Sequence, residues 1–299
     1  MKQNSSPKKE NLFLAFMVCL LAYVLALAVA IGIGYLLHNQ MHIIAVVLIA
    51  DIFATLVIYV FSHIFKNTSL YDPYWSLAPI PIALFWMVYS DSHTSLSVTQ
   101  IIVLVIVALY GIRLTLNWIR GWQGLKHEDW RYTKYRDENP KLFWLINLTG
   151  LQLMPTSLVF LGCLSLYAVF YSSNTSFGYL DAIGIIISLM GIAMETVSDE
   201  QLRKFKKTKE KGQLMTSGLW SVSRHPNYFG EISFWWGLFF FALSADLSNW
   251  WMIVGPVSIT ILFFVISIPM MEKKLLERYP QYAEYKKKVS MFFPWFQKK

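Results

Sequence analysis

Five side chains that can bind anions, accept hydrogen bonds or exchange protons fall within residues 224–231. They are Arg224, His225, Asn227, Tyr228 and Glu231. A basic linker over residues 203–211 precedes them, and an apolar run follows from Ile232. Pro226 should prevent one helix from continuing through this motif, and Gly230 leaves room for a close backbone approach. Because polar groups beside hydrocarbon are costly unless something binds them, the motif predicts a cofactor and substrate site.

A second candidate set lies along one face of a predicted helix over residues 97–118. Tyr110 and Arg113 are three residues apart, Asn117 follows four residues later, and Arg120 follows three after that. Residues at these spacings share a helix face. Such a stripe, leading into a basic loop, suits an anionic ligand. A hydrogen-bonded seam between helices is the alternative interpretation.

A third set, Glu195, Asp199, Arg203 and Lys206, repeats at helical spacing where another apolar run enters the basic linker. An exposed exit turn with ion pairs between residues four apart would explain Asp199 and Arg203. Glu195 lies one turn deeper, where that explanation is weaker. We expect all four side chains to contribute to an anion or cofactor site.

Two further carboxylates lie in or beside apolar runs. Asp72 belongs to the segment LYDPYWSLAP, next to Tyr71 and close to Tyr74. An interfacial aromatic belt and a turn at Asp72–Pro73 are the simple interpretation. A carboxylate beside phenols also suits proton relay or carbonyl polarisation. Asp51, inside a predicted span, has the alternative of a hydrogen bond to nearby backbone, and its sequence context assigns it no role.

The composition places these residues in a membrane protein. The chain has 299 residues, of which 56% are hydrophobic and only 15% are charged. Apolar runs of about 18 residues or more predict an all-α, polytopic integral membrane helix bundle with about eight transmembrane helices. The predicted spans are residues 12–37, 42–65, 76–90, 97–118, 143–172, 179–199, 229–245 and 250–271.

The positive charges support one orientation. Of the 26 Lys and Arg residues, 25 lie on one predicted side of the spans, and Arg113 lies inside the fourth span. The positive-inside rule makes that side cytoplasmic, with both termini there. The net charge of +8 is then an asymmetry across the membrane, and no nucleic-acid motif accompanies it.

Cys19, Cys163 and the scattered histidines show no metal-ligand spacing, so we expect no metal.

We expect a disordered cytoplasmic N-terminus over residues 1–11, followed by a single membrane domain over residues 12–299.

Residues 195–295 resemble the steroid 5-alpha-reductase-like membrane reductases, especially their bacterial branch of unknown function. The matching motifs are E-x-x-x-D from Glu195, S-R-H-P-N-Y-F-G-E from Ser223, M-E-K-K-L around Glu272, Y-P-x-Y-x-E-Y and F-F-P-W. Upstream, Y-D-P-Y-W-S and D-W-R-Y fit the same pattern. The resemblance implies a helical enzyme, expected in a bacterial inner membrane, that binds NADPH from the cytoplasmic side and takes a lipophilic substrate from the lipid.

The resemblance also implies roles for particular residues. Asn227 and Glu231 match an element that contacts the cofactor, and Asp199 with Arg203 matches a membrane-end pair. Tyr110, three residues before Arg113, matches the catalytic tyrosine. The partner glutamate of that tyrosine has no identity match here, and Asp72 is the expected substitute. The full expected cofactor-binding set is Arg113, Asn117, Glu195, Asp199, Arg203, Lys206, Arg224, His225, Asn227, Tyr228 and Glu231, and the expected catalytic set is Tyr110, Asp72 and Glu231.

The expected reaction is hydride transfer from NADPH to the conjugated double bond of a steroid-like or isoprenoid-like enone or enal, in lipid metabolism. Membrane methyltransferases of the isoprenylcysteine or phospholipid type are the main alternative, because they also carry R-H-P-x-Y and bind S-adenosylmethionine. They typically follow it with a pair of glutamates, where this chain has Met271 and Glu272. A non-catalytic lipid-binding or transport protein is a third possibility, although no inverted repeat supports it.

Overall fold

The apolar runs form helices, as they must where no water is present to satisfy backbone amides and carbonyls. The computed structural model describes residues 11–90, 95–172 and 176–297, and all the regular secondary structure within them is helical. Six helical stretches in this part of the chain are long and apolar enough to cross a bilayer, as in an integral membrane protein. They are Leu12–Leu37, Ile43–Ile64, Val98–Gly121, Phe143–Tyr171, Tyr179–Thr208 and Leu247–Arg278.

The all-α prediction is therefore confirmed, whereas the number of eight spans is not. The predicted span over residues 76–90 contains α4 (Pro79–Tyr89), whose 11 residues are too few to cross the bilayer. The predicted span over residues 229–245 lies in α10 (Pro226–Ala245), which has 20 residues but is less apolar because Glu231 and several aromatic, Gly and Ser residues interrupt it. The cytoplasmic location of both termini stays a prediction, and residues 1–10 of the predicted disordered segment lie outside the described residues.

The chain divides into two compact units. Unit 1 comprises Met1–Ile82 and Leu114–Phe160, and unit 2 comprises Ala83–Arg113 and Leu161–Lys299. The predicted single domain stays a prediction.

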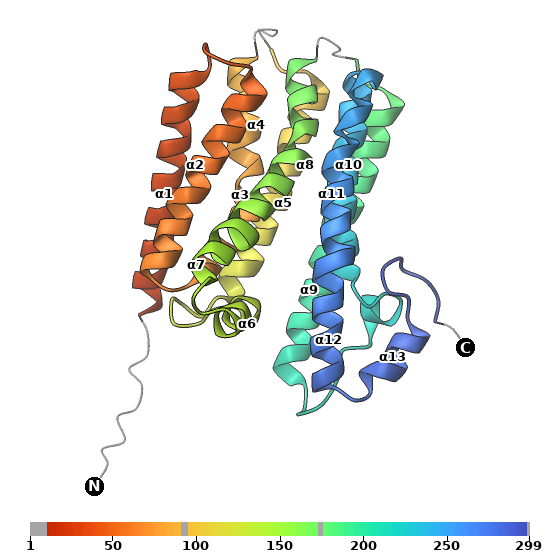
Figure 1. Cartoon of the computed structure of the whole chain (residues 1–299). Helices are drawn as coiled ribbons and strands as arrows, with labels where there is room; N and C mark the ends of the chain where they lie inside the picture. The colour runs from red at the N-terminus through yellow and green to blue at the C-terminus, as the bar shows by residue number, and fades with distance from the viewer. Residues whose placement is uncertain (1–10, 91–94, 173–175, 298–299) are drawn as a thin grey trace. The chain divides into compact units, whose positions relative to one another are not determined.

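In unit 1, α1 (Leu12–Leu37) and α2 (Ile43–Ile64) run side by side (Figure 1). The other elements with residues in this unit are η1 (Thr68–Tyr71), α3 (Tyr74–Leu77), the beginning of α4, the end of α5 (Val98–Gly121), α6 (Trp130–Glu138), α7 (Phe143–Leu145), the π-helix η2 (Ile146–Leu153) and the beginning of α8 (Met154–Tyr171).

The loop before α6 is tied to the turn that precedes η1. The Asn67 side chain donates to the carbonyl oxygens of Leu125 and His127 at 2.6 and 3.1 Å. The Thr68 amide donates to Glu128 Oε1 at 2.7 Å. Within unit 1 this loop is therefore a packed element attached to the Asp72 segment.

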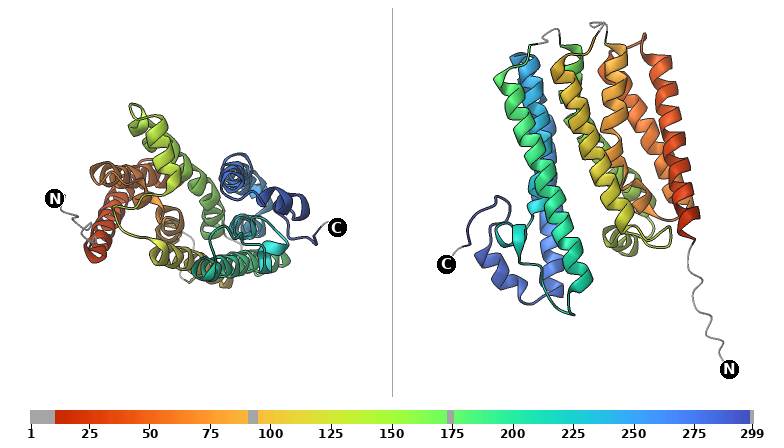
Figure 2. Two further views of the ribbon diagram at one scale, coloured as in Figure 1. Left: turned by 90° about the horizontal axis from the view of Figure 1, so that it is seen from below. Right: turned by 180° about the vertical axis from the view of Figure 1, so that it is seen from behind.

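Unit 2 holds the C-terminal helices together with parts of α4, α5 (Val98–Gly121) and α8. Its long helices α9 (Tyr179–Thr208) and α10 run alongside one another (Figures 1 and 2). The rest of the unit consists of η3 (Gly218–Ser221), η4 (Leu247–Ile253), α11 (Val254–Leu262), the π-helix η5 (Phe263–Ser267), α12 (Ile268–Arg278) and α13 (Tyr282–Lys288).

Glycines let the backbones of α9 and α10 approach closely. A Cβ atom added at Gly230 would lie 2.5 Å from the Gly191 carbonyl oxygen and 2.7 Å from the Glu195 amide nitrogen. The close approach predicted for Gly230 is confirmed. Pro226 occupies the first turn of α10, where its missing amide costs nothing, so the predicted helix break is also confirmed. This packing places Glu195 of α9 against the first turns of α10.

Candidate active site

A buried tyrosine and a buried glutamate from distant parts of the chain meet in unit 2. The Tyr110 hydroxyl of α5 donates to Glu231 Oε1 of α10 at 2.7 Å. The Trp235 indole Nε1, one turn further along α10, donates to the same oxygen at 2.9 Å. Tyr110 has 0% and Glu231 4% of its surface exposed, and the Tyr110 ring stacks on Phe234 with centroids 3.8 Å apart. The arrangement fixes a phenol hydroxyl beside a carboxylate away from water.

Arg113, three residues after Tyr110, connects this pair to α9. Its Nη2 lies 2.8 Å from Glu195 Oε1 and 3.3 Å from Asp199 Oδ2. The charges of Glu195 and Glu231 also act on one another. Two carboxyl groups thus pair with one guanidinium and a third accepts from the tyrosine, and we call Tyr110, Arg113, Glu195, Asp199 and Glu231 the Tyr110 cluster.

The Tyr110 cluster has unused hydrogen-bonding capacity. Arg113 Nε and Glu195 Oε2 are both buried and have no hydrogen-bond partner. Because unpaired buried polar atoms are costly, these two atoms mark where a bound molecule would restore hydrogen bonds. The cluster therefore has both a donor and an acceptor for a polar ligand.

The exit-turn interpretation of α9 accounts for only part of the ion pairs. Asp199 pairs with Arg113 of another helix, and Arg203 pairs with Glu200 on its own helix. The charge of Lys206 also acts on Asp199. Asp199 and Glu195 thus belong to the buried cluster, while Arg203 forms a local pair at the helix surface.

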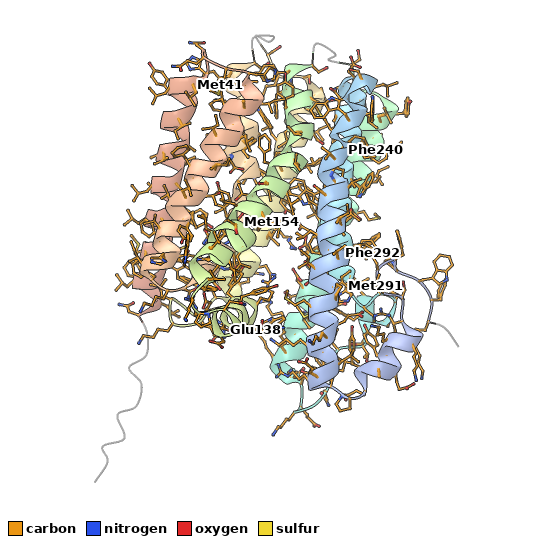
Figure 3. All side chains as sticks on the ribbon, in the orientation of Figure 1. Met41, Glu138, Met154, Phe240, Met291 and Phe292 are labelled. Atoms are coloured by element: carbon orange, nitrogen blue, oxygen red, sulfur yellow. The ribbon has the colours of Figure 1, made fainter. Side chains whose placement is uncertain are left out.

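The Arg224 side chain fastens the C-terminal segment instead of facing open solvent. Its Nε donates to Glu272 Oε1 at 2.7 Å, and its Nη1 donates to the carbonyl oxygens of Lys286 and Val289 at 2.9 and 2.7 Å. The Lys286 ammonium holds the other Glu272 oxygen at 2.7 Å. Ser223 Oγ adds a hydrogen bond to the carbonyl oxygen of Phe292, which is labelled in Figure 3 and whose ring packs against Phe264 of η5. We call Arg224, Glu272 and Lys286 the Arg224 cluster.

The other motif residues surround the start of α10. His225 is buried, stacks on Tyr228 with ring centroids 5.4 Å apart, and lies 3.4 Å from Glu272 Oε1. Burial lowers the pKa of His225, and the Glu272 carboxylate opposes that shift. Asn227 is half-buried in the first turn of the helix.

A surface hollow of about 630 Å³ lies between the basic linker and the C-terminal segment. Its lining residues are Phe205, Lys211, Gly212, Gln213, Leu214, Thr216, Gln281 and Tyr285. No member of the Tyr110 cluster lines it. Its ammonium, amide and hydroxyl groups suit an anion or a polar head group.

Two expected site residues belong to unit 1. Asp72 Oδ1 accepts a hydrogen bond from the Tyr132 hydroxyl at 2.6 Å. Burial raises the pKa of Asp72 to about 6, although the nearby Arg131 guanidinium and the Tyr132 hydrogen bond lower it. The expected partnership of Asp72 with Tyr110 stays a prediction, as does the role of Asn117. In unit 2, the acid that Tyr110 contacts is Glu231.

The sequence analysis missed two partners. Trp235 holds the same oxygen of Glu231 as Tyr110 does, and its spacing of four residues from Glu231 was a usable signal. Lys286 pairs with Glu272, but the two are far apart in sequence and no local pattern connects them.

Comparisons with known proteins agree with the motifs. An uncharacterized protein of Schizosaccharomyces pombe is 26% identical over 255 residues, covering 77% of this chain and 73% of that protein. The protein-S-isoprenylcysteine O-methyltransferase of Saccharomyces cerevisiae is 32% identical over 125 residues, which are 38% of this chain and 48% of that enzyme. These relatives are fungal, so the bacterial branch and inner-membrane location stay predictions. No solved structure is significantly similar to the chain. Residues 58–289 match the family described as "Protein of unknown function (DUF1295)", and the chain therefore belongs to this steroid 5-alpha-reductase-like family.

Proposed function

We propose that this protein is a membrane reductase that transfers a hydride from NADPH to a carbon–carbon double bond conjugated with the carbonyl of a lipophilic enone or enal. The observation that carries the proposal is the buried hydrogen bond from Tyr110 to Glu231. A phenol held in a dry environment can donate to a carbonyl oxygen on which negative charge develops, and such preorganised donors supply much of enzymatic catalysis.

The Tyr110 and Trp235 donors share one acceptor, and this has a chemical consequence. When Tyr110 turns its hydrogen toward a substrate carbonyl, Glu231 Oε1 keeps the hydrogen bond from Trp235 at 2.9 Å. The carboxylate is then not left unpaired, so redirecting the phenol costs less. Phe234 stacks on the Tyr110 ring and limits the movement to the hydroxyl group.

The residues present fit a reduced nicotinamide dinucleotide in part. Bound NADPH would supply the hydride. The unpartnered Arg113 Nε and Glu195 Oε2 would give its polar groups a donor and an acceptor. Lys206 and Lys211 belong to the basic linker and suit phosphate groups. Arg224, expected to bind the cofactor, already makes three hydrogen bonds within the protein, so we assign it to holding the C-terminal segment.

The proposal is tested with the full chain purified in detergent. Thermal stability is measured with saturating NADPH, NADH or S-adenosylmethionine. A ligand at 100 times its Kd stabilises the native state by about 2.7 kcal/mol, which a melting curve detects. We expect NADPH to raise the midpoint and then to be oxidised when lipophilic enones are added. An unchanged midpoint with NADPH, together with a raised midpoint with S-adenosylmethionine, would refute the reductase proposal.

A methyltransferase of the isoprenylcysteine type is the second candidate. Two observations favour it: the similarity to the yeast methyltransferase over 125 residues, and the buried pairing of Arg224 with Glu272. The same melting experiment separates the candidates, because only this one requires S-adenosylmethionine to bind.

A further inference from the structure

Unit 1 contains a buried carboxyl group that the proposed reaction does not use. Asp51 lies in the middle of α2, and only 5% of its surface is exposed. Its Oδ1 accepts a hydrogen bond from the Tyr74 hydroxyl at 2.6 Å, whereas its Oδ2 is buried without any hydrogen-bond partner. An ionisable group inside a membrane span is costly and marks a functional site by default.

A line of hydroxyl groups leads away from this carboxyl. Thr55 lies four residues after Asp51, on the same face of α2, and its side chain acts on the Tyr74 hydroxyl. Thr55 Oγ1 lies 2.8 Å from Thr156 Oγ1 of α8, and Thr156 Oγ1 lies 2.8 Å from the Tyr71 hydroxyl. Tyr71, Tyr74, Thr55 and Thr156 are all buried, at 5% exposure or less. The line of hydroxyl groups from Tyr71 to Asp51 is therefore buried along its whole length.

The directions of these hydrogen bonds follow from the number of hydrogens available. Each hydroxyl has one hydrogen to donate. Tyr74 gives its hydrogen to Asp51, so in a hydrogen bond between Thr55 and Tyr74 the donor has to be Thr55. Thr156 must then donate to Thr55, and Tyr71 to Thr156. All four hydrogens point toward the carboxylate, which is the alignment a proton needs in order to move along such a line.

The outer end of the line lies next to a second acid. Tyr71 precedes Asp72, and the charge of Asp72 acts on the Tyr71 hydroxyl. Asp72 is only half-buried and accepts a hydrogen bond from Tyr132, so this end is nearer to solvent than Asp51 is. Protons can enter the line here from water or from a protonated Asp72.

We propose that Asp51 is a proton-binding carboxyl within the membrane, and that Tyr71, Thr156, Thr55 and Tyr74 carry the proton between it and the Asp72 end of unit 1. In one transfer, a donor at the outer end protonates the Tyr71 oxygen. Tyr71 passes its own hydrogen to Thr156, Thr156 to Thr55, Thr55 to Tyr74, and Tyr74 to Asp51 Oδ1. Each hydroxyl breaks one O–H bond and forms another, the carboxylate gains one proton, and no electrons are exchanged.

Infrared spectroscopy of the full-length protein in lipid bilayers tests the proposal. A protonated carboxyl has a C=O stretch that shifts when its proton is replaced by deuterium. The band of Asp51 is assigned by its absence from Asp51→Asn. We expect the wild-type band to exchange readily in D₂O, and Thr156→Val to slow that exchange roughly 100-fold, the scale of a positioned proton-transfer group. Thr156→Ser keeps the hydroxyl and should exchange like the wild type.

The direction of the change separates a proton path from a structural contact. If Thr156 only held α2 and α8 together, Thr156→Val would loosen unit 1 and make exchange faster. Tyr71→Phe provides a second test that does not disturb the helix contact, and it should also slow exchange. The absence of an Asp51-dependent band, or exchange that is unchanged or faster in both Thr156→Val and Tyr71→Phe, would overturn the proposal.

Discussion

Replacing Tyr110 with Phe is the most direct perturbation of the candidate active site. The change removes one oxygen atom and leaves the stacked ring on Phe234 in place. It abolishes the 2.7 Å hydrogen bond to Glu231 Oε1. Because Trp235 still donates to that oxygen, the carboxylate keeps one partner. Tyr110→Phe thus tests the hydroxyl group with little disturbance of its surroundings.

The structure sets the size of the two expected effects. A hydrogen bond to a charged group contributes about 1.5–3 kcal/mol, and the remaining Trp235 donor places the loss of stability near the lower end of this range. Loss of a donor that stabilises a developing oxyanion reduces turnover about 100- to 1,000-fold. Since Tyr110 has no proposed contact with the phosphates, NADPH affinity should stay near that of the wild type.

The assay compares kcat for a lipophilic enone with the NADPH-induced shift in melting midpoint. Trp235→Phe is the control, because it removes the other donor to the same oxygen and also leaves a cavity where Trp235 is fully buried. It should destabilise the protein more than Tyr110→Phe and reduce kcat less. If the control lost as much turnover as Tyr110→Phe, or if Tyr110→Phe abolished NADPH binding, the assignment of Tyr110 to catalysis would be wrong.

The remaining predictions concern packing, pH, the C-terminal segment and charge. Gly230→Ala should destabilise the protein by about 1–3 kcal/mol in melting experiments, because the added methyl overlaps the α9 backbone. Gly32→Ala has open space around it and should be neutral or stabilising. Burial raises the pKa of Asp72 from 3.8 to about 6, so between these pH values the folded chain holds a proton that the unfolded chain releases. The free energy of unfolding should therefore fall as the pH rises from about 4 to about 6, and Asp72→Asn should reduce this dependence on pH. Arg224→Lys should lose the hydrogen bonds to the two carbonyl groups, so trypsin should remove the C-terminal segment faster than from the wild type. Glu195→Gln should weaken binding of NADP⁺ more than binding of NADPH, measured by melting midpoints with each nucleotide; equal weakening would show that Glu195 does not stabilise the cationic nicotinamide ring.

Local spacing predicted much of the site's framework. Tyr110 and Arg113 lie one turn apart, and the structure has both in one cluster. Pro226 and Gly230 have the roles that their backbone chemistry indicates. These features follow from helix geometry and residue type, which act over a few residues.

What the sequence could not predict depends on contacts between distant segments. The guanidinium of Arg224 bonds carbonyl groups of residues 286 and 289, and backbone acceptors leave no mark on a sequence. The composition of α10 is less apolar than that of an ordinary span. Twelve of its residues are buried within the protein instead of facing lipid, so this helix does not need an apolar surface on every side. Hydropathy describes the average solvent of a segment, and it cannot distinguish lipid from neighbouring helices.

The charge balance of the Tyr110 cluster bears on the choice between the two candidate reactions. Arg113 is paired with two acids, Glu195 and Asp199, so when both acids are ionised the cluster favours a positive charge near it. Only interactions that strengthen toward the transition state accelerate a reaction. These carboxylates would increasingly stabilise a nicotinamide ring, which becomes cationic as its hydride leaves. They would instead stabilise a sulfonium most strongly before methyl transfer, when its charge is complete, and would lose that interaction as the methyl group departs. Ionised acids in this cluster would therefore assist hydride transfer and oppose methyl transfer, which supports the reductase proposal.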